Sequence, residues 1–354
     1  MRWSIALPGS HPIDKQLEVI ELADRLGFHA YYFNDEIYHY DIWSVMTQAA
    51  LRTENIRLVA VTHVVVKDPV YLAQQLLTLD MVSNGRVEAL YSIGSVAMLK
   101  QFGVDLARLK PIGRLREAQQ VLRMLLDTSR ITFKGKYHDY EGISTAAQKV
   151  QEAIPLTMGG IKGPLTFELA GEVSHGLMTG LLYSREALRY AADHFKIGAE
   201  RGGRDWRSLD LGAGVIGTIA SDSAAARNAA RKIGAYYLPA LGDEAAARHG
   251  IDPRRLEPIK EAFQRGDTRQ AIEMTPDDIA DSQVLATGSP SEVIEQLKVI
   301  EEEGYNHICI DLIDPLSVKN MTGIDVGGVP DAAGQLQLLH DQIVPAFRPM
   351  TRHR

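Results

Sequence analysis

The chain of 354 residues is poor in cysteine and contains no long apolar run. Its one cysteine, Cys309, cannot form an intrachain disulfide and excludes a zinc site built from several thiolates. No stretch approaches the ~18 apolar residues that a membrane-spanning helix needs. The N-terminal segment MRWSIALPGS also lacks the apolar core of a signal peptide. These absences favour a cytoplasmic protein without a membrane partner.

The chain also has no excess of positive charge, because its 38 Lys and Arg residues are outnumbered by 45 Asp and Glu residues. A nucleic-acid partner would favour a basic face, so we expect none. His11, His39 and His63 are scattered without the spacing of a metal-binding motif, so we expect no metal. A Gly-x-Ser-x-Gly elbow and a Walker loop are missing, so neither an α/β-hydrolase nor a P-loop enzyme is predicted.

Short apolar strands alternate with amphipathic helices along most of the chain, which is typical of a parallel α/β fold. The eight predicted strands lie within residues 3–8, 30–33, 56–66, 87–94, 154–160, 176–182, 209–220 and 307–313. A closed (β/α)₈ TIM barrel fits this pattern better than an open doubly wound sheet. Residues 240–285 are charged and helical and break the rhythm. We therefore expect residues 1–354 to form one barrel domain with a helical insertion at about 240–285.

Polar residues follow two of the predicted strands, at the ends where barrel enzymes place their chemistry. The second strand delivers Asp35 and Glu36. This carboxylate pair could hydrogen-bond a cofactor ring and move protons if burial raises the pKa of one member. An aspartate that caps a helix beside a solvated glutamate is an equally good interpretation. His63, after the third strand, could face the same opening, although a buried structural histidine is the more common outcome.

The segment MGGIKGP, residues 158–164, joins the fifth strand to a helix. Its three glycines allow the backbone to approach a ligand, and amide groups at a helix N-terminus suit a phosphate. Lys162 could add a positive charge. A tight turn without a ligand is the alternative. The glycine spacing does not match the dinucleotide-binding fingerprint of a Rossmann fold.

Four longer segments carry a family resemblance. They are residues 60–90 (a strand, its helix and an Asn-Gly-Arg turn), 111–126 (an arginine-containing helix), 154–178 (the glycine turn between two strands) and 287–310 (the closing helix and strand). In this order they resemble the luciferase-like superfamily of flavin- and deazaflavin-dependent oxidoreductases, nearest the F420-dependent methylene-tetrahydromethanopterin reductase-like branch. The resemblance implies a (β/α)₈ barrel enzyme, commonly a homodimer, that acts on a small molecule.

The resemblance also implies a cofactor and a reaction. Coenzyme F420 would bind, and hydride would pass between it and a small organic substrate. An FMN-dependent monooxygenase using reduced flavin and oxygen is the alternative on the same barrel, and a barrel that has lost its chemistry is a third. The segments 38–43, 96–110 and 240–285 match the family least and would shape the substrate site. The hairpin around Lys134-Gly135-Lys136, or the insertion, would serve as a lid.

Individual roles follow from the positions that match the family. Asp35 would lie close to the cofactor ring, and Glu36 would stand in for the histidine that many deazaflavin-dependent relatives have there. The bond between Ala60 and Val61 would be a non-proline cis peptide that forms a bulge behind the ring. The predicted cofactor-binding residues are Asp35, Ala60, Val61, Thr62, Ser92, Gly94, Gly159, Gly160 and Gly163, and the predicted catalytic residues are Asp35, Glu36 and His63.

Overall fold

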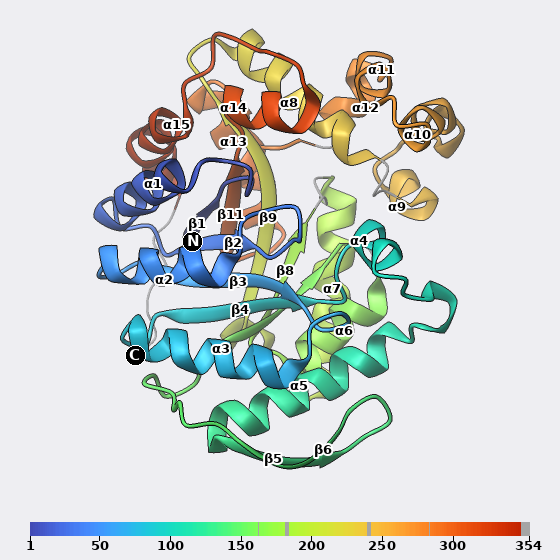
Figure 1. The fold of residues 1–354 in the computed structure, drawn as a ribbon. Coiled ribbons are helices and arrows are strands. Elements are labelled where there is room, and N and C mark those ends of the chain that lie inside the picture. The colour runs from blue at the N-terminus through green and yellow to red at the C-terminus, as the bar shows by residue number, and fades with distance from the viewer. Residues whose placement is uncertain (162, 181–183, 239–241, 283, 348–354) are drawn as a thin grey trace. The chain divides into compact units, whose positions relative to one another are not determined.

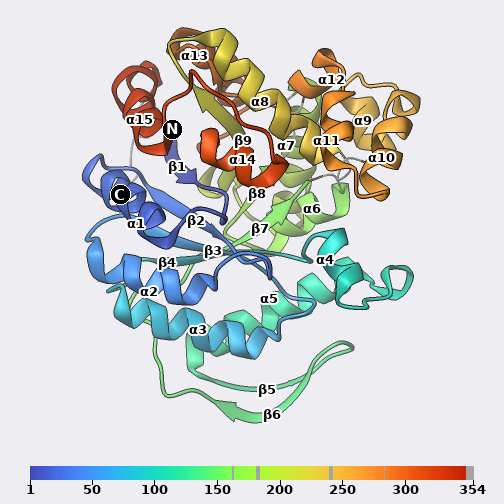
Figure 2. The same ribbon diagram turned by 45° about the horizontal axis from the view of Figure 1, so that its top comes forward.

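The computed structural model describes residues 1–161, 163–180, 184–238, 242–282 and 284–347, which belong to two compact units. We call one the terminal unit, because it contains both ends of the chain: Met1–Phe28, Thr179–Asp193 and Leu211–Arg354. The central unit contains His29–Met178 and His194–Asp210. Figures 1 and 2 show the elements of both units coloured along the chain.

Four parallel strands form the sheet of the central unit, in the order β2-β3-β4-β7. They are β2 (Ala30–Asn34), β3 (Arg57–His63), β4 (Val87–Ser92) and β7 (Leu156–Gly160). Asn34 of β2 is in register with Val61 of β3, which pairs in turn with Leu90 of β4. The carboxyl ends of β2, β3 and β4 therefore lie side by side.

The helices of the central unit follow its strands. They are α2 (Ile42–Arg52), α3 (Pro69–Val82), α4 (Val96–Gln101), α5 (Pro111–Thr128) and α6 (Pro164–Val173), and a hairpin of β5 (Arg130–Lys134) and β6 (Asp139–Ser144) comes after α5. Helix α3 begins where Asp68 accepts the N–H of Val70 and Pro69 occupies the first turn. Helices α3 and α5 lie side by side, and the hairpin runs along α5 (Figures 1 and 2).

The Asn-Gly-Arg turn after α3 fixes the start of β4. Asn84 and Gly85 have φ angles of 53° and 83°, in the left-handed region that allows the chain to reverse. The guanidinium of Arg86 then donates hydrogen bonds to the carbonyl oxygens of Ala50 and Thr53, at 2.8 and 2.9 Å. One side chain thus satisfies the free carbonyls at the end of α2 and holds that helix against the start of β4.

The terminal unit has its own parallel strands, in the order β10-β9-β11-β1. They are β1 (Arg2–Ala6), β9 (Asp210–Ile219), β10 (Thr287–Gly288) and β11 (His307–Leu312). Its longer helices are α1 (Ile13–Arg25), α8 (Ser223–Tyr237), α13 (Pro290–Glu302), α14 (Pro315–Thr322) and α15 (Ala332–Leu338). Strand β8 (Gly176–Gly180) and helix α7 (Arg185–Arg201) each contain residues of both units.

The segment proposed as an insertion contains four short helices within residues 242–282. They are α9 (Asp243–Arg248), α10 (Glu257–Gln264), α11 (Thr268–Glu273) and α12 (Asp277–Asp281). Buried side chains, among them Leu238, Leu256 and Ile259, form their common core. These helices are therefore held together by apolar packing and not by charge alone, although the surface of the segment is highly charged.

Eight strands of the structure correspond to the eight predicted ones: β1, β2, β3, β4, β7, β8, β9 and β11. The third lies within the segment 56–66 and ends at His63, where its carboxyl end was expected. The last residues of the sixth predicted strand, Leu181 and Leu182, lie outside the described residues. The sequence pattern did not predict α4, β10, α14 or α15. Within the described part of the chain, no helix is long and apolar enough to cross a membrane.

Candidate active site at the carboxyl ends of β2, β3 and β4

Asp35 follows β2 and is held by two donors. Its side chain is buried, and its Oδ2 accepts a hydrogen bond from the Thr62 hydroxyl at 2.7 Å. The ammonium group of Lys67 forms an ion pair with the same oxygen. The backbone N–H of Asp35 donates to the carbonyl of Val61 at 2.9 Å. Asp35 is therefore an anion fixed in position by β3 and by the loop that follows it.

Glu36 is the next residue but lies in a different environment. Burial raises the pKa of the Glu36 carboxyl, the charge of Asp35 adds to the increase, and a hydrogen bond with Tyr38 opposes it. The Nε2 atom of His39 lies 3.8 Å from the carboxylate of Glu36. The two adjacent carboxyls thus lie in different environments: Asp35 is paired with a cation, and the pKa of Glu36 is raised by burial. Such a difference allows two carboxyls to take separate roles.

His63 ends β3 and lies in the same place. Its side chain is buried, and its Nδ1 has no hydrogen-bond partner among the described residues. Burial lowers the pKa of His63, the charge of Lys67 lowers it further, and Asp35 opposes the change. The ring is therefore neutral near pH 7 and leaves one nitrogen available to a ligand.

The turn after β4 brings a glycine against His63. The Ser92 hydroxyl accepts a hydrogen bond from the Gly94 N–H at 3.0 Å. Gly94 has a φ of +97°, and a Cβ placed there would lie 2.7 Å from Met98 Cε and 3.2 Å from His63 Cβ. A side chain at this position would be both strained and crowded, so glycine is required for the approach of this turn to His63.

The glycine turn after β7 leads into α6. Gly163 is the N-cap of α6 and provides no side-chain cap, Pro164 has no N–H, and the N–H of Thr166 donates to the carbonyl of Gly163 at 3.1 Å. The start of the helix therefore offers a ligand the N–H of Leu165. A Cβ on Gly159 would make ordinary contacts, the nearest at 3.6 Å, whereas a Cβ on Gly160 would lie 2.8 Å from the ring of Phe167. Gly160 is therefore explained by packing, whereas packing requires a glycine at neither Gly159 nor Gly163. Lys162 lies outside the described residues.

One predicted feature of β3 is wrong. The described residues contain no cis peptide bond, and the bond between Ala60 and Val61 is trans. Ala60 pairs with Phe33 on one side and Ala89 on the other, and Val61 continues both ladders. Because β3 is bonded to two neighbours in unbroken register, its backbone stays regular at the point where the bulge was expected.

The hairpin expected to act as a lid is attached to α5. The carboxylate of Glu117 accepts hydrogen bonds from the backbone N–H groups of Lys136, Tyr137 and His138, at 2.7, 2.8 and 3.2 Å. The guanidinium of Arg114 also lies over the ring of Tyr137, 4.8 Å from its centroid. These contacts favour a fixed hairpin over a moving lid.

Sequence reasoning missed Lys67. The structure brings together Asp35, Glu36, Thr62 and His63 as expected, but the cation that pairs with Asp35 was not predicted. Its only signal was a lysine shortly after a predicted strand, immediately before the Asp-Pro that begins the next helix. In the described part of the chain, no cluster of three or more histidine, cysteine or acidic side chains is placed to hold a metal.

Strand–helix alternation with polar groups at strand ends is typical of a barrel, and comparison with known structures supports this fold. The F420-dependent tetrahydromethanopterin reductase from Methanopyrus kandleri superposes with a TM-score of 0.87 at 24% identity, covering 98% of this chain and 99% of that one. This likeness confirms the predicted (β/α)₈ barrel.

The family follows from the sequence comparison. A family model described as luciferase-like monooxygenase matches residues 1–307, so the chain belongs to this family, as predicted from the four segments. Curated relatives include the 5,10-methylenetetrahydromethanopterin reductase of Methanopyrus kandleri, 25% identical with 97% of each chain covered. Another is an F420-dependent glucose-6-phosphate dehydrogenase of Intrasporangium calvum, 26% identical over 81% of this chain and 85% of the relative.

Proposed function

We propose that the protein is an oxidoreductase that transfers hydride between coenzyme F420 and a small organic substrate. The observation that carries the proposal is the convergence of fixed Asp35, protonatable Glu36 and neutral His63 at adjoining strand ends. The proposal is supported by relatives that are named as F420-dependent or as methylenetetrahydromethanopterin reductases and align over most of the chain.

The residues present fit such a coenzyme. The uncapped start of α6, with Gly159 and Gly163, would hold the phosphate, and Ser92 and Gly94 would lie beside the chain that joins the phosphate to the ring. The free Nδ1 of buried His63 provides one unsatisfied polar atom for the ring system. When bound, the coenzyme supplies the hydride carrier, and the protein supplies binding, orientation and electrostatics.

The protein's own part in the reaction is to manage charge and protons. Asp35, held by Thr62 and Lys67, would present a fixed carboxylate oxygen to the bound coenzyme. Glu36 exchanges a proton, because its raised pKa brings its titration closer to working pH. His63 remains neutral and acts as a hydrogen-bonding group. Ala60 and Val61 support the site through the regular strand β3.

A titration of purified protein with oxidised coenzyme F420 and, separately, with FMN tests the proposal. We expect F420 to bind and FMN to bind at least tenfold more weakly, measured by fluorescence quenching and calorimetry. Preferential binding of FMN would contradict the proposal and favour the monooxygenase that uses reduced flavin and oxygen. Binding of neither would favour a barrel without redox chemistry.

A matched pair of variants separates specific binding from general loss of structure. Gly163→Asp places a negative charge at the start of α6, where it would repel a phosphate while still capping the helix. Gly163→Ser caps the helix without the charge. We expect F420 affinity to fall much further in the aspartate variant than in the serine variant, with similar thermal stability for both.

The proposal also covers the oligomeric state of the protein and its location in the cell. We infer that the chain works as a homodimer in the cytoplasm and acts on a small molecule, without a nucleic-acid or membrane partner. The small-molecule substrate is supported by the named relatives. Sedimentation velocity of the purified protein measures the assembly directly.

A further inference from the structure

Lys67 lies on the loop between β3 and α3, immediately before the residue that caps the helix. The first end of this loop is fixed where the N–H of Val64 donates to the carbonyl of Ser92 at 3.0 Å. Among the described residues, the backbone of residues 65–67 forms no hydrogen bond. The position of Lys67 therefore depends strongly on the second end of the loop, which is Asp68.

Asp68 uses its two carboxylate oxygens for two different elements. Its Oδ1 accepts the N–H of Val70 at 2.8 Å and caps α3, whereas its Oδ2 accepts the hydroxyl of Tyr140 at 2.9 Å. The first contact is local. The second comes from a residue 72 positions further along the chain, on strand β6 of the hairpin. Asp68 thus connects the loop that carries Lys67 with the hairpin β5–β6.

Tyr140 is kept as a hydrogen-bond donor by its surroundings. Burial and the bond to Asp68 raise the pKa of Tyr140, so its hydroxyl stays protonated. The Nδ1 of His138 lies 3.1 Å from the same hydroxyl oxygen, and the two rings stack with centroids 5.9 Å apart. Since the hydroxyl proton is directed to Asp68, His138 donates through Nδ1. Each group therefore orients the next, from His138 through Tyr140 to Asp68.

The hairpin is fixed at its turn but leaves a space beside the start of α3. The three backbone hydrogen bonds to Glu117 hold the turn on α5. A cavity of about 310 Å³ lies between the hairpin and α3, and its lining includes Asp68, Tyr71, Tyr140 and Ile143. Because this cavity lies where apolar packing would otherwise join the two elements, the bond between Tyr140 and Asp68 contributes a larger share of their connection there.

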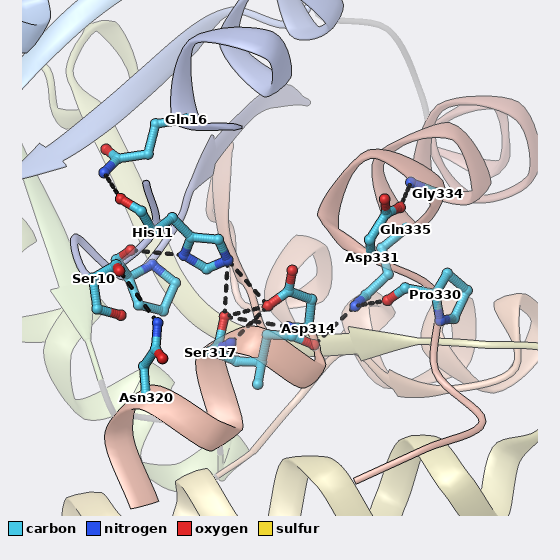
Figure 3. A network of polar contacts seen from close by, with 12 residues as sticks. Ser10, His11, Gln16, Asp314, Ser317, Asn320, Pro330, Asp331, Gly334 and Gln335 are labelled. Atoms are coloured by element: carbon cyan, nitrogen blue, oxygen red, sulfur yellow. Dashed lines mark hydrogen bonds and ion pairs between the residues drawn. The ribbon is translucent and has the colours of Figure 1, made fainter. Parts of the chain in front are cut away.

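A second aspartate that begins a helix after a strand shows the same arrangement, within the terminal unit. Asp314 is the N-cap of α14, and its Oδ1 accepts hydrogen bonds from the backbone N–H of Ser317 at 2.8 Å and from His11 Nε2 at 3.1 Å (Figure 3). In each unit, a helix-capping aspartate is also bonded to an element far away in the sequence. The cap at Asp68 differs in what precedes it, which is Lys67 of the candidate active site.

We propose that Tyr140 of the hairpin is a positioning residue that, through Asp68, holds Lys67 against Asp35. Without the Tyr140 hydroxyl, Asp68 keeps only its local cap, and the end of the loop is free to move. The ammonium group of Lys67 then meets Asp35 for a smaller fraction of the time. The importance of Asp35 for the coenzyme rests on the proposed function, whereas the effect of Tyr140 on the position of Lys67 does not.

The first test measures Lys67 without the coenzyme. The rate at which acetic anhydride acetylates Lys67, followed by mass spectrometry, reports how often this side chain leaves Asp35. Lys100, which is exposed on α4, is the internal reference. We expect Lys67 to react about two- to tenfold faster, relative to Lys100, in Tyr140→Phe than in the wild type, because one hydrogen bond is lost.

Two further variants accompany this test. Tyr137→Phe is the matched control, because it removes a hydroxyl from the same hairpin, on a ring that packs against Arg114 of α5, and it should react as the wild type. Asp68→Ser keeps one oxygen to cap α3 but loses the one that accepts from Tyr140, so it should react as Tyr140→Phe. Equal acetylation rates of Lys67 in the wild type and in these variants would overturn the proposal.

The second test determines whether Tyr140 acts on the coenzyme through Lys67. F420 affinity is measured by fluorescence quenching in the wild type, Tyr140→Phe, Lys67→Met and the double variant. We expect Tyr140→Phe to weaken binding about two- to tenfold when Lys67 is present, and to have no further effect when it is replaced. A general structural role of Tyr140 would weaken binding by the same factor in both backgrounds, and that result would contradict the proposal.

The two proposals fail in different ways. If the wild type does not bind F420, the proposed function is wrong, and the acetylation rates still decide whether Tyr140 positions Lys67. If F420 binds to the wild type while Tyr140→Phe changes neither the acetylation of Lys67 nor the affinity for F420, the positioning role alone is wrong.

Discussion

Lys67 places a positive charge against the buried carboxylate of Asp35, and its side chain remains 33% exposed at the site. An ion pair of this kind does two things at once. It compensates a charge that burial would otherwise penalise, and it fixes the carboxylate oxygen that Thr62 also holds. The structure therefore makes Lys67 a positioning residue whose effect passes through Asp35.

The variant Lys67→Met tests this role, with Lys67→Arg as the matched control that retains the charge. We expect the methionine variant to lose at least tenfold in F420 affinity and about 1–2 kcal/mol of stability, because it leaves Asp35 buried with one neutral donor. The arginine variant should recover most of both. Calorimetric titration and urea unfolding provide the measurements. Equal behaviour of the two variants would show that the positive charge at this position does not determine coenzyme affinity or stability.

At this scale the sequence revealed which side chains meet but not how they interact. Asp35, Glu36 and His63 could be predicted because each stands next to the end of an apolar strand, and strand ends converge in a barrel. Lys67 could not, since its contact depends on the path of a loop. The opposite environments of Asp35 and Glu36 depend on burial and partners, which no spacing reveals. The expected cis bond at Ala60–Val61 was transferred from relatives and failed because β3 is regular here.

At the scale of whole elements, the hairpin β5–β6 was predicted as a structure, but its attachment to α5 was not. Its alternating pattern was enough to predict two strands. Its role as a lid stays a prediction, which is disfavoured because one residue of α5, Glu117, binds the turn. Burial acts to raise the pKa of Glu117, yet the three backbone donors lower it overall. A side chain 19 residues before its first partner leaves no local signal in the sequence.

Removal of this contact should release the hairpin without unfolding the unit. In Glu117→Ala we expect amide hydrogens of residues 130–144 to exchange faster, corresponding to a local loss of about 1–3 kcal/mol. Glu141→Gln, on the exposed surface of the same hairpin, is the control and should change little. Unchanged exchange in the alanine variant would mean that the strand pairing alone holds the hairpin.

At the scale of the whole molecule, the repeated strands were predicted from the sequence, but several additional helices and one short strand were not. Eight strands were found from their apolar runs, because a strand buried on both faces must be apolar along its length. Helices α14 and α15 and the two-residue strand β10 were not predicted. Strand β10 is too short to show any period, and each of these elements is stabilised by the strands and helices that it covers.

Asp311 of β11 should affect the stability of the whole protein, because its Oδ1 is buried without a hydrogen-bond partner among the described residues. Burial raises the pKa of Asp311 to about 7, above its ordinary value of 3.8, so between these limits the native state holds a proton that the unfolded chain releases. The contribution of Asp311 to the free energy of unfolding must therefore fall as pH rises through this window and level off above it. Asp311→Asn has no such group. We expect the variant to gain about 2–3 kcal/mol on the wild type between about pH 5 and about pH 8 in urea unfolding, while Asp325→Asn, a control at a carboxylate paired with Lys319, follows the wild type. Parallel curves for wild type and Asp311→Asn would show that the carboxyl ionises in the folded protein as readily as in the unfolded chain.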